Sequence, residues 1–213
     1  MKCDERIMRL YLVTDSAWIG IKTLPEQVEE ALKGGVTCVQ LREKELDDEE
    51  MLKEAIEIKA LCRKYGVPFI VNDNVEVALA CDADGVHIGQ QDMEAGEVRQ
   101  KIGKDKIMGV SAQTVEQAIR AEWNGADYLG VGAVFATSTK MDADTVSYET
   151  LKDICASVNI PVVAIGGINA DNILKLYGAG AEGIAVVSAV FASNDIEIAA
   201  SVLLAKSEIM TCT

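Results

Sequence analysis

The stretch Pro161-Val162-Val163-Ala164-Ile165-Gly166-Gly167-Ile168-Asn169 joins an apolar run to a pair of glycines. Such a run is typical of a strand in a parallel sheet whose two faces are both covered. Glycine lets backbone N–H groups approach a phosphate closely, and the start of a following helix adds a favourable dipole. The stretch therefore predicts a strand-turn-helix unit with an anion site at its turn. A glycine pair that serves only a tight turn is the alternative.

The same unit recurs along the whole chain. Strands are predicted at residues 9–14, 38–42, 69–72, 85–88, 107–111, 128–131, 162–165 and 183–187. Helices are predicted at residues 25–33, 47–65, 75–81, 93–102, 114–123, 148–157, 170–177 and 196–206. Strict alternation implies a parallel sheet, and eight units in 213 residues predict a single-domain α/β protein, residues 1–213, folded as a (β/α)8 TIM barrel. An open doubly wound sheet is the competitor, but no G-x-G-x-x-G turn follows the first strand.

Composition and charge narrow the class of partner. The chain is 49% hydrophobic and 25% charged, which is ordinary for a globular domain. A net charge of -14 and a pI near 4.5 argue against nucleic acid or an anionic membrane, since both attract basic surfaces. No run of about 18 apolar residues and no basic leader before an apolar stretch occurs, so a cytoplasmic protein is expected. The six cysteines form no CxxC pair and are interpreted as reduced thiols, mostly in the core.

Polar side chains at alternating positions follow the apolar run Thr37-Cys38-Val39. They are Gln40, Arg42 and Lys44. Side chains at positions i, i+2 and i+4 of a strand face one way, so these three are expected to project together. Guanidinium binds oxyanions through two hydrogen bonds and ammonium adds a point charge, which suits a diphosphate. The alternative is a solvated strand end beside the acidic run from Glu43 to Glu50.

Two carboxylates, Asp73 and Asp92, lie just past neighbouring predicted strands. Hard oxygen ligands in small number beside a phosphate site are the usual way in which Mg²⁺ is held. The alternative for each aspartate is a role at the start of a helix, as a cap or first-turn residue. His87 is the only histidine and lies within an apolar run, so it is interpreted as a packed or supporting residue rather than a catalyst.

Hydroxyl groups and a lysine follow the later strands. Ser111 ends the fifth strand, where it is expected either to cap the next helix or to bind a ligand atom. The longest connection, residues 132–147, carries Thr137-Ser138-Thr139-Lys140, which can form an anion site or simply a polar loop. The eighth strand ends at Val187-Ser188. Loops after strands seven and eight are where barrels commonly bind phosphate.

Taken together, these segments resemble the thiamine phosphate synthase family, and they span nearly the whole chain in order. The similar segments are Tyr11 to Asp15, Val39 to Lys44, Val71 to Asp73, Asp84 to Asp92, Gly109 to Ser111, Gly125 to Gly132, Thr137 to Lys140, Ala164 to Ile168 and Val186 to Ser188. The resemblance implies a (β/α)8 barrel. It also implies a transferase that joins 4-amino-2-methyl-5-(diphosphooxymethyl)pyrimidine to a thiazole phosphate and releases diphosphate. With the carboxylated thiazole, carbon dioxide is released as well.

Carried over position by position, the resemblance implies a site with three parts. The pyrimidine diphosphate falls to Gln40, Leu41, Arg42, Glu43, Lys44, Asn72, Ser111 and Lys140, of which Arg42, Lys44, Ser111 and Lys140 are expected to take part in catalysis. The thiazole phosphate falls to Thr137, Ser138, Thr139, Gly167, Val187 and Ser188. The cofactor implied is Mg²⁺ on Asp73 and Asp92. The family often has proline where this chain has Ala133 and Ala136, so a more mobile loop is expected there.

Two other functions on the same barrel are possible from sequence. One is a thiazole tautomerase, an isomerase that handles only the thiazole half, and the other is a non-catalytic sensor of phosphorylated ligands. Relatives of the tautomerase generally lack the complete diphosphate and metal set, whereas this chain carries all of it. The partners expected are small phosphorylated substrates, and the sequence does not indicate an oligomeric state.

Overall fold

Eight parallel strands close into a barrel in the order of the sequence, with β8 pairing back onto β1. The computed structural model describes residues 5–18, 20, 22–90, 92–136 and 145–212. The strands are β1 (Leu10–Val13), β2 (Cys38–Leu41), β3 (Phe69–Asn72), β4 (Gly85–Ile88), β5 (Ile107–Ala112), β6 (Tyr128–Val131), β7 (Val162–Ile165) and β8 (Gly183–Val186). The predicted TIM barrel is therefore confirmed, and each predicted strand is present.

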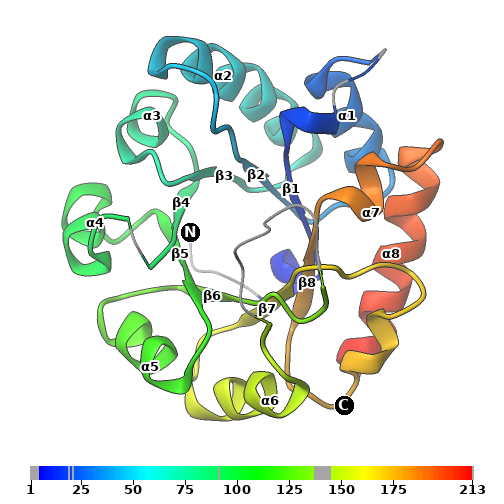
Figure 1. Cartoon of the computed structure of the whole chain (residues 1–213). Coiled ribbons are helices and arrows are strands. Elements are labelled where there is room, and N and C mark those ends of the chain that lie inside the picture. Colours follow the sequence, from blue (N-terminus) through cyan, green and yellow to red (C-terminus); the bar gives the residue numbers. More distant parts are fainter. Residues whose placement is uncertain (1–4, 19, 21, 91, 137–144, 213) are drawn as a thin grey trace.

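Helices form a ring outside the barrel (Figure 1). The α-helices are α1 (Leu24–Lys33), α2 (Asp48–Tyr65), α3 (Val75–Ala80), α4 (Ala95–Ile102), α5 (Val115–Trp123), α6 (Tyr148–Ser157), α7 (Ser188–Phe191) and α8 (Ile196–Thr211). Short 3-10 helices are η1 (Glu5–Met8), η2 (Ser16–Trp18) and η3 (Ile173–Leu176).

Three helical segments differ from the prediction. The helix predicted at 170–177 is only the 3-10 helix η3, because the side chains of Asn169 and Asn172 bind nearby backbone N–H groups and compete with α-helical bonding. The short helix α7 after β8 was not predicted. The last helix runs to Thr211 rather than to residue 206, since no glycine or proline interrupts it there.

Capping side chains define where several helices begin. Thr23 and Glu26 form a reciprocal capping box at the start of α1. Asp47 accepts two backbone N–H bonds at the start of α2. Thr114 caps α5, so the predicted alternative in which Ser111 caps this helix is wrong. The Ser111 hydroxyl is thus left for another role.

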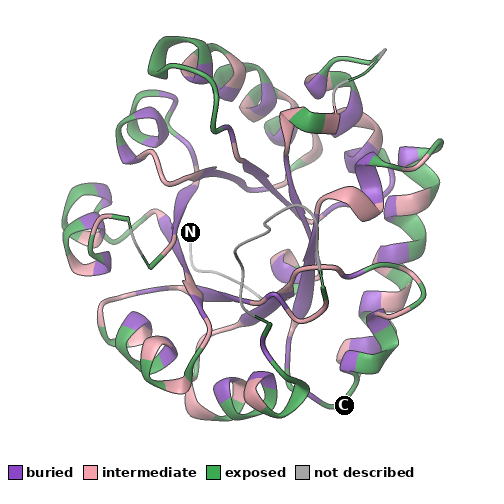
Figure 2. Cartoon of the chain, viewed as in Figure 1, coloured by how far each residue is buried: buried purple, intermediate pink, exposed green. Residues whose placement is uncertain are grey.

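Apolar side chains pack in two layers, one between strands and helices and one inside the barrel. The strands are buried except for the half-buried Asn72, Ser111 and Ile165 near their carboxyl ends, and the helices turn their buried sides inward (Figure 2). Residues that alternate along a barrel strand face the interior. The interior cluster consists of Met8, Tyr11, Val13, Cys38, Ile70, Ile107, Tyr128, Val163 and Ala185.

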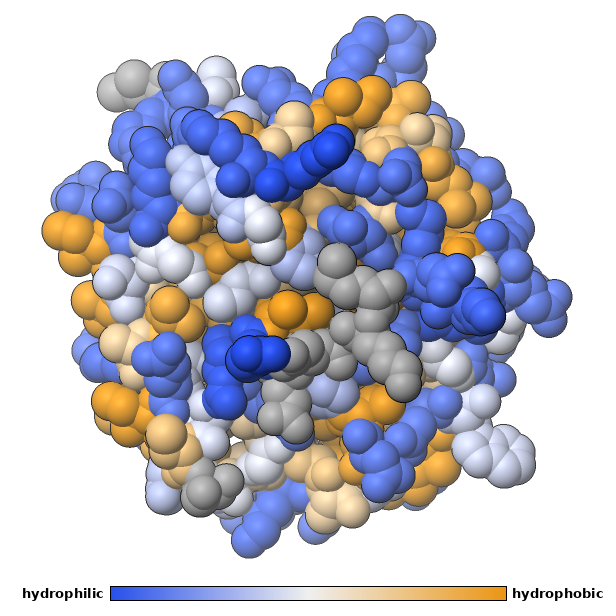
Figure 3. All heavy atoms as spheres, turned by 180° about the vertical axis from the view of Figure 1, so that it is seen from behind, coloured by the Kyte–Doolittle hydropathy of each residue, from blue (hydrophilic) through white to orange (hydrophobic). Residues whose placement is uncertain are grey.

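Hydrophilic and hydrophobic side chains are mixed on the face of the molecule that lies behind the view of Figure 1. From behind, hydrophilic side chains cover most of the visible face and hydrophobic ones lie between them in separate patches (Figure 3). Within the part of the chain that the structure describes, each helix is too short or too polar to cross a lipid bilayer.

Candidate active site

The polar residues predicted from the sequence gather at the carboxyl ends of the strands. In a parallel barrel all these ends lie on one face, where the loops that follow them can share a ligand. Gln40 lies near the end of β2, Asn72 ends β3 and Ser111 lies near the end of β5. The closed strand order therefore brings residues far apart in sequence to one mouth.

The end of β2 places its side chains in two directions. Gln40 is 4% exposed and its side-chain amide donates to the Tyr11 hydroxyl at 2.8 Å, so it points into the barrel. The Leu41 side chain is fully buried in the outer layer, and only its backbone can reach a ligand at the mouth. Because β2 ends at Leu41, the strand alternation that predicted a common direction for Gln40, Arg42 and Lys44 does not extend to the last two.

The fully buried Thr14 holds the start of the loop after β2. Its hydroxyl accepts from the backbone N–H of Arg42 at 2.9 Å and also lies 3.5 Å from the Arg42 carbonyl. Its own N–H donates to the Gln40 carbonyl at 2.9 Å. Glu43, which follows Arg42, is 9% exposed. Burial raises the pKa of its carboxyl, and the nearby Ser16 hydroxyl lowers that pKa in part. The loop backbone is therefore fixed where it enters the site.

Lys44 reaches across to the next strand. Its ammonium nitrogen lies 2.5 Å from a carboxylate oxygen of Asp73, which directly follows β3. Asp73 has a left-handed backbone with φ of 60°, and its N–H donates to the His87 carbonyl on β4 at 2.8 Å. A predicted diphosphate ligand and a predicted metal ligand are thus in direct contact.

The carboxyl group of Asp92 interacts with the carboxyl group of Asp73. Partial burial raises the pKa of Asp92, and the neighbouring Asp73 carboxyl raises it further through a hydrogen bond and through charge repulsion. The N–H of Gly89 donates to Asp92 at 2.6 Å and, with Lys44, lowers this pKa in part. Neither aspartate caps a helix, since Asn74 caps α3 and Glu94 precedes α4 without a side-chain cap. The helix-capping alternative for this pair is therefore wrong.

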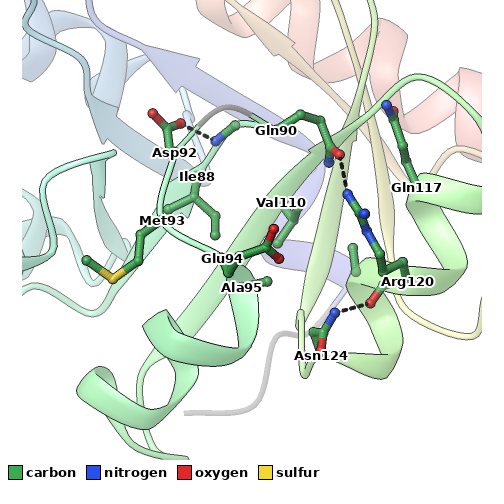
Figure 4. Close-up of a pocket in the computed structure, with 12 residues that line it drawn as sticks. Ile88, Gln90, Asp92, Met93, Glu94, Ala95, Val110, Gln117, Arg120 and Asn124 are labelled. Atoms are coloured by element: carbon green, nitrogen blue, oxygen red, sulfur yellow. Dashed lines mark hydrogen bonds between the residues drawn. The ribbon is translucent and has the colours of Figure 1, made fainter.

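The loop that carries Asp92 borders a groove between α4 and α5 that is partly open to solvent. Figure 4 shows Asp92 against the Gly89 backbone and Gln90 extended toward Arg120. The Gln90 amide also donates to the Ser111 carbonyl at 2.6 Å. Gln90 thus ties the loop after β4 to the end of β5, although it was not predicted as a site residue.

Ser111 and His87 are hydrogen-bonded at the mouth, with 3.0 Å between the serine oxygen and His87 Nε2. His87 is 9% exposed, and its other ring nitrogen lies 2.9 Å from the Tyr128 hydroxyl. His87 is therefore packed, as interpreted from the sequence, and its role as a supporting residue rather than a catalyst stays a prediction. Tyr11, Thr14 and Tyr128 were missed, because buried hydroxyls inside apolar strands leave no signal in hydrophobic periodicity.

The glycine pair after β7 makes room for the loop after β6. Gly166 and Gly167 have φ of 101° and 65°, and a Cβ on Gly167 would lie 2.4 Å from the Ala136 carbonyl oxygen. The Phe135 N–H donates to the Gly166 carbonyl at 3.0 Å. These contacts bring the two loops together, as a phosphate site built from both requires.

Three predicted residues for the thiazole phosphate, Thr137, Ser138 and Thr139, lie outside the described residues, as does Lys140. Two others, Val187 and Ser188, are half-buried at the junction of β8 with α7. The first N–H groups of a helix have no partner within it, so this junction offers donors to an anion.

The chain is similar to known proteins in both sequence and structure. A family model described as thiamine monophosphate synthase matches residues 10–190. A thiamine-phosphate synthase from Ruminiclostridium cellulolyticum is 55% identical over 195 residues, covering 92% of this chain and 93% of the relative. Its counterpart from Clostridioides difficile is 50% identical over 192 residues, covering 90% and 91%. The solved thiamine phosphate pyrophosphorylase from Pyrococcus furiosus superposes with a TM-score of 0.89 at 42% identity, covering 97% and 98% of the two chains.

Proposed function

Because the chain belongs to the thiamine monophosphate synthase family and is a thiamine-phosphate synthase, a transferase of thiamine biosynthesis, we propose that its mouth binds the pyrimidine diphosphate between β2, β3 and β5. The observation that carries this proposal is the contact between Lys44 and Asp73, with Asp92 beside it. Cationic ligands for a diphosphate and carboxylates for a metal meet at one point. The relatives at about half identity are synthases, which sets aside the tautomerase and sensor alternatives.

The proposed cofactor is Mg²⁺, held by Asp73 and Asp92. Burial raises the pKa of the Asp92 carboxyl, the neighbouring Asp73 carboxyl raises it further, and Lys44 offsets only part of this rise. A divalent cation between the two carboxylates would relieve their repulsion. Oxygen ligands in this number fit Mg²⁺, which completes its shell with water and substrate oxygens. When bound, the ion would supply positive charge against the leaving diphosphate.

The proposed roles of the remaining residues follow from charge and position. Arg42, Lys44 and Lys140 neutralise negative charge as it grows on the departing oxygens, while Gln40, Asn72 and Ser111 orient the pyrimidine. Leu41 at the end of β2 and Glu43 in the loop that follows it are proposed to contribute backbone groups. The thiazole phosphate is proposed to bind Thr137, Ser138, Thr139, Gly167, Val187 and Ser188. Donors from two adjoining loops and from the start of α7 support that assignment.

The proposed reaction needs no protein nucleophile. The C–O bond between the pyrimidine methylene and diphosphate breaks, and diphosphate leaves with the electron pair. The lone pair of the thiazole nitrogen then forms the new C–N bond. The protein's task is to hold the two rings in line and to balance charge at the leaving group.

We also propose that the protein works in the cytoplasm on small phosphorylated substrates, without nucleic-acid or membrane partners. The net charge of -14 supports this, because a strongly acidic surface repels both polyanions.

Release of diphosphate by the purified protein tests the proposal. The reaction contains pyrimidine diphosphate, thiazole phosphate and Mg²⁺, and each component is omitted in turn. Release that requires all three, with thiamine phosphate identified by mass, is the expected result. Full release without Mg²⁺ in metal-free buffer would remove the cofactor assignment. Conversion of the thiazole phosphate alone would overturn the diphosphate half of the site.

A further inference from the structure

An unbroken chain of hydrogen bonds crosses the barrel interior from β2 to β5. It links five side chains from five different strands. The Gln40 amide donates to Tyr11 at 2.8 Å, the Tyr11 and Tyr128 hydroxyls lie 2.7 Å apart, the Tyr128 hydroxyl lies 2.9 Å from His87 Nδ1, and His87 Nε2 lies 3.0 Å from the Ser111 hydroxyl. Its two ends are residues that the proposed function assigns to the pyrimidine diphosphate.

The middle of this chain is shielded from water. Tyr11 is 2% exposed and Tyr128 is fully buried, both within the apolar interior cluster. Burial raises the pKa of Tyr11 well above its ordinary value, so its phenol stays protonated at any physiological pH. A buried polar network in low dielectric is strong when satisfied and costly when broken. The chain is therefore expected to persist as one unit.

Two glycines make space for the contact between Tyr128 and His87. A Cβ on Gly109 would lie 2.1 Å from Tyr128 Cζ and 2.5 Å from His87 Nδ1. A Cβ on Gly130 would lie 3.0 Å from His87 Cε1. Strand interiors seldom carry glycine, because it weakens them. Its presence at both positions fits a barrel built to admit this pair of rings.

The direction of one hydrogen bond in the chain fixes the direction of the next, because each phenol has a single hydrogen. With the Gln40 amide donating to Tyr11, the Tyr11 hydrogen goes to Tyr128 and the Tyr128 hydrogen goes to His87 Nδ1. His87 then donates from Nε2 to the Ser111 oxygen. This leaves the Ser111 hydrogen as a donor and the Gln40 side-chain carbonyl oxygen as an acceptor for a ligand. When His87 is neutral, reversing the hydrogen bond between the two phenols requires the bonds on either side of it to reverse as well.

We propose that Tyr11, Tyr128 and His87 are positioning residues that couple the hydrogen-bonding direction of Gln40 to that of Ser111. The inference rests on the proposed function, which places both end residues against the pyrimidine. An aminopyrimidine presents an amino donor next to a ring-nitrogen acceptor. One acceptor at Gln40 and one donor at Ser111 form the complementary pattern, and the buried chain prevents either from changing alone. Recognition of the ring then depends on residues that never touch it.

A triple-mutant cycle tests the coupling. Gln40→Ala and Ser111→Ala are made singly and together, first in the natural chain and then with Tyr128→Phe. The phenylalanine keeps the ring and removes the hydroxyl that joins Tyr11 to His87. Kinetic constants for diphosphate release are measured for both substrates. Tyr65→Phe is the matched control, since it removes a hydroxyl bonded to Glu29 far from the barrel interior.

In the natural chain, each single substitution is expected to lower kcat/KM for the pyrimidine diphosphate. The double variant should have a kcat/KM about tenfold higher than the value expected if the two single losses multiplied. The reason is that breaking either end of the chain of hydrogen bonds disrupts the same unit. With Tyr128→Phe the two losses should multiply to within about twofold. Tyr128→Phe alone should lower kcat/KM for the pyrimidine diphosphate and leave KM for the thiazole phosphate unchanged. The control Tyr65→Phe should leave both constants unchanged.

Two other outcomes overturn different claims. Single losses that multiply in both backgrounds would mean that the chain does not couple its ends. Single variants with normal diphosphate release would mean instead that Gln40 and Ser111 do not serve the reaction, so the proposed function of these residues would fail. Tyr11→Phe breaks the chain at its other phenol and replaces Tyr128→Phe in the cycle if that variant does not fold.

Discussion

The ammonium nitrogen of Lys44 lies 2.5 Å from a carboxylate oxygen of Asp73, which joins the loop after β2 to the loop after β3. This pair is half in solvent, with side-chain exposures of 51% and 27%, so it contributes little to the free energy of unfolding. Its importance is for binding, since Lys44 occupies a carboxylate that the proposed Mg²⁺ needs.

Lys44→Ala should therefore have opposite effects on the two ligands. Loss of the competing ammonium should tighten binding of Mg²⁺ to the substrate-free protein several-fold, while KM for the pyrimidine diphosphate should rise about tenfold or more. Calorimetric titration with Mg²⁺ and steady-state kinetics measure the two effects. Lys53→Ala is the control, since Lys53 forms an exposed pair with Glu49 on α2. Weaker Mg²⁺ binding in Lys44→Ala would argue against Asp73 as a ligand.

Asp73→Asn and Asp92→Asn should each raise the Mg²⁺ concentration needed for half-maximal activity, by about tenfold or more, because one of two anionic ligands is lost. Asp82→Asn is a matched control for Asp73→Asn. Both aspartates have a left-handed backbone, with φ of 53° and 60°, and Asp82 pairs with lysines away from the mouth. A metal titration curve that does not move in either test variant would leave these carboxylates without a metal role.

Lys140→Ala should lower kcat by about a hundredfold and change KM much less, if the lysine balances charge that develops only as diphosphate leaves. The comparison is with Lys152→Ala, which removes an exposed lysine from α6. Single-turnover measurements separate the chemical step from product release. A near-normal kcat would remove Lys140 from the chemistry.

The sequence predicted which residues lie at the mouth of the barrel better than it predicted the contacts that hold them there. Lys44 and Asp73 were placed at one mouth, because their loops follow neighbouring strands of a predicted barrel. Their direct contact depends on the path of the loop after β2, which strand alternation does not describe. The network around His87 could not be predicted, since contacts across the barrel depend on register and ring size. The helix predicted at residues 170–177 is only the 3-10 helix η3 for a local reason, since the side chains of Asn169 and Asn172 bind backbone N–H groups at its start.

Gly109→Ala should destabilise the protein by about 1–3 kcal/mol or prevent folding, because the added methyl group would overlap the Tyr128 ring at 2.1 Å. Gly96→Ala provides the opposite case. Gly96 lies in α4, where a Cβ meets only the Asn124 oxygen at 3.5 Å, so alanine should raise the free energy of unfolding by up to about 1 kcal/mol. Urea unfolding of both variants measures the difference. Equal stability of the two would mean that the interior tolerates a larger side chain beside Tyr128.

Glu54→Gln should stabilise the protein at neutral and higher pH but not in acid. Glu54 lies on α2, and burial raises the pKa of its carboxyl to about 7, with further contributions from the charges of Glu43 and Glu57. Below the ordinary value of 4.5, the carboxyl is protonated in both folded and unfolded chains and has no effect on stability. Between that value and about 7, only the unfolded chain releases the proton, so stability falls as pH rises. Above about pH 7, the full destabilisation from the ionised Glu54 carboxyl is present.

Glutamine has nearly the same shape and carries no charge, so this cost disappears in the variant. The free energies of unfolding should agree at pH 4.5 and differ by on the order of 1–3 kcal/mol at pH 8, with the variant more stable. Urea unfolding at pH 4.5, 6 and 8 measures the trend. Glu208→Gln removes an exposed carboxyl from α8 and should show no comparable dependence on pH. A constant difference between the Glu54→Gln variant and the natural chain at all three values would mean that Glu54 is ionised throughout. The burial of Glu54 beside Glu43 would then make no pH-dependent contribution to the free energy of unfolding.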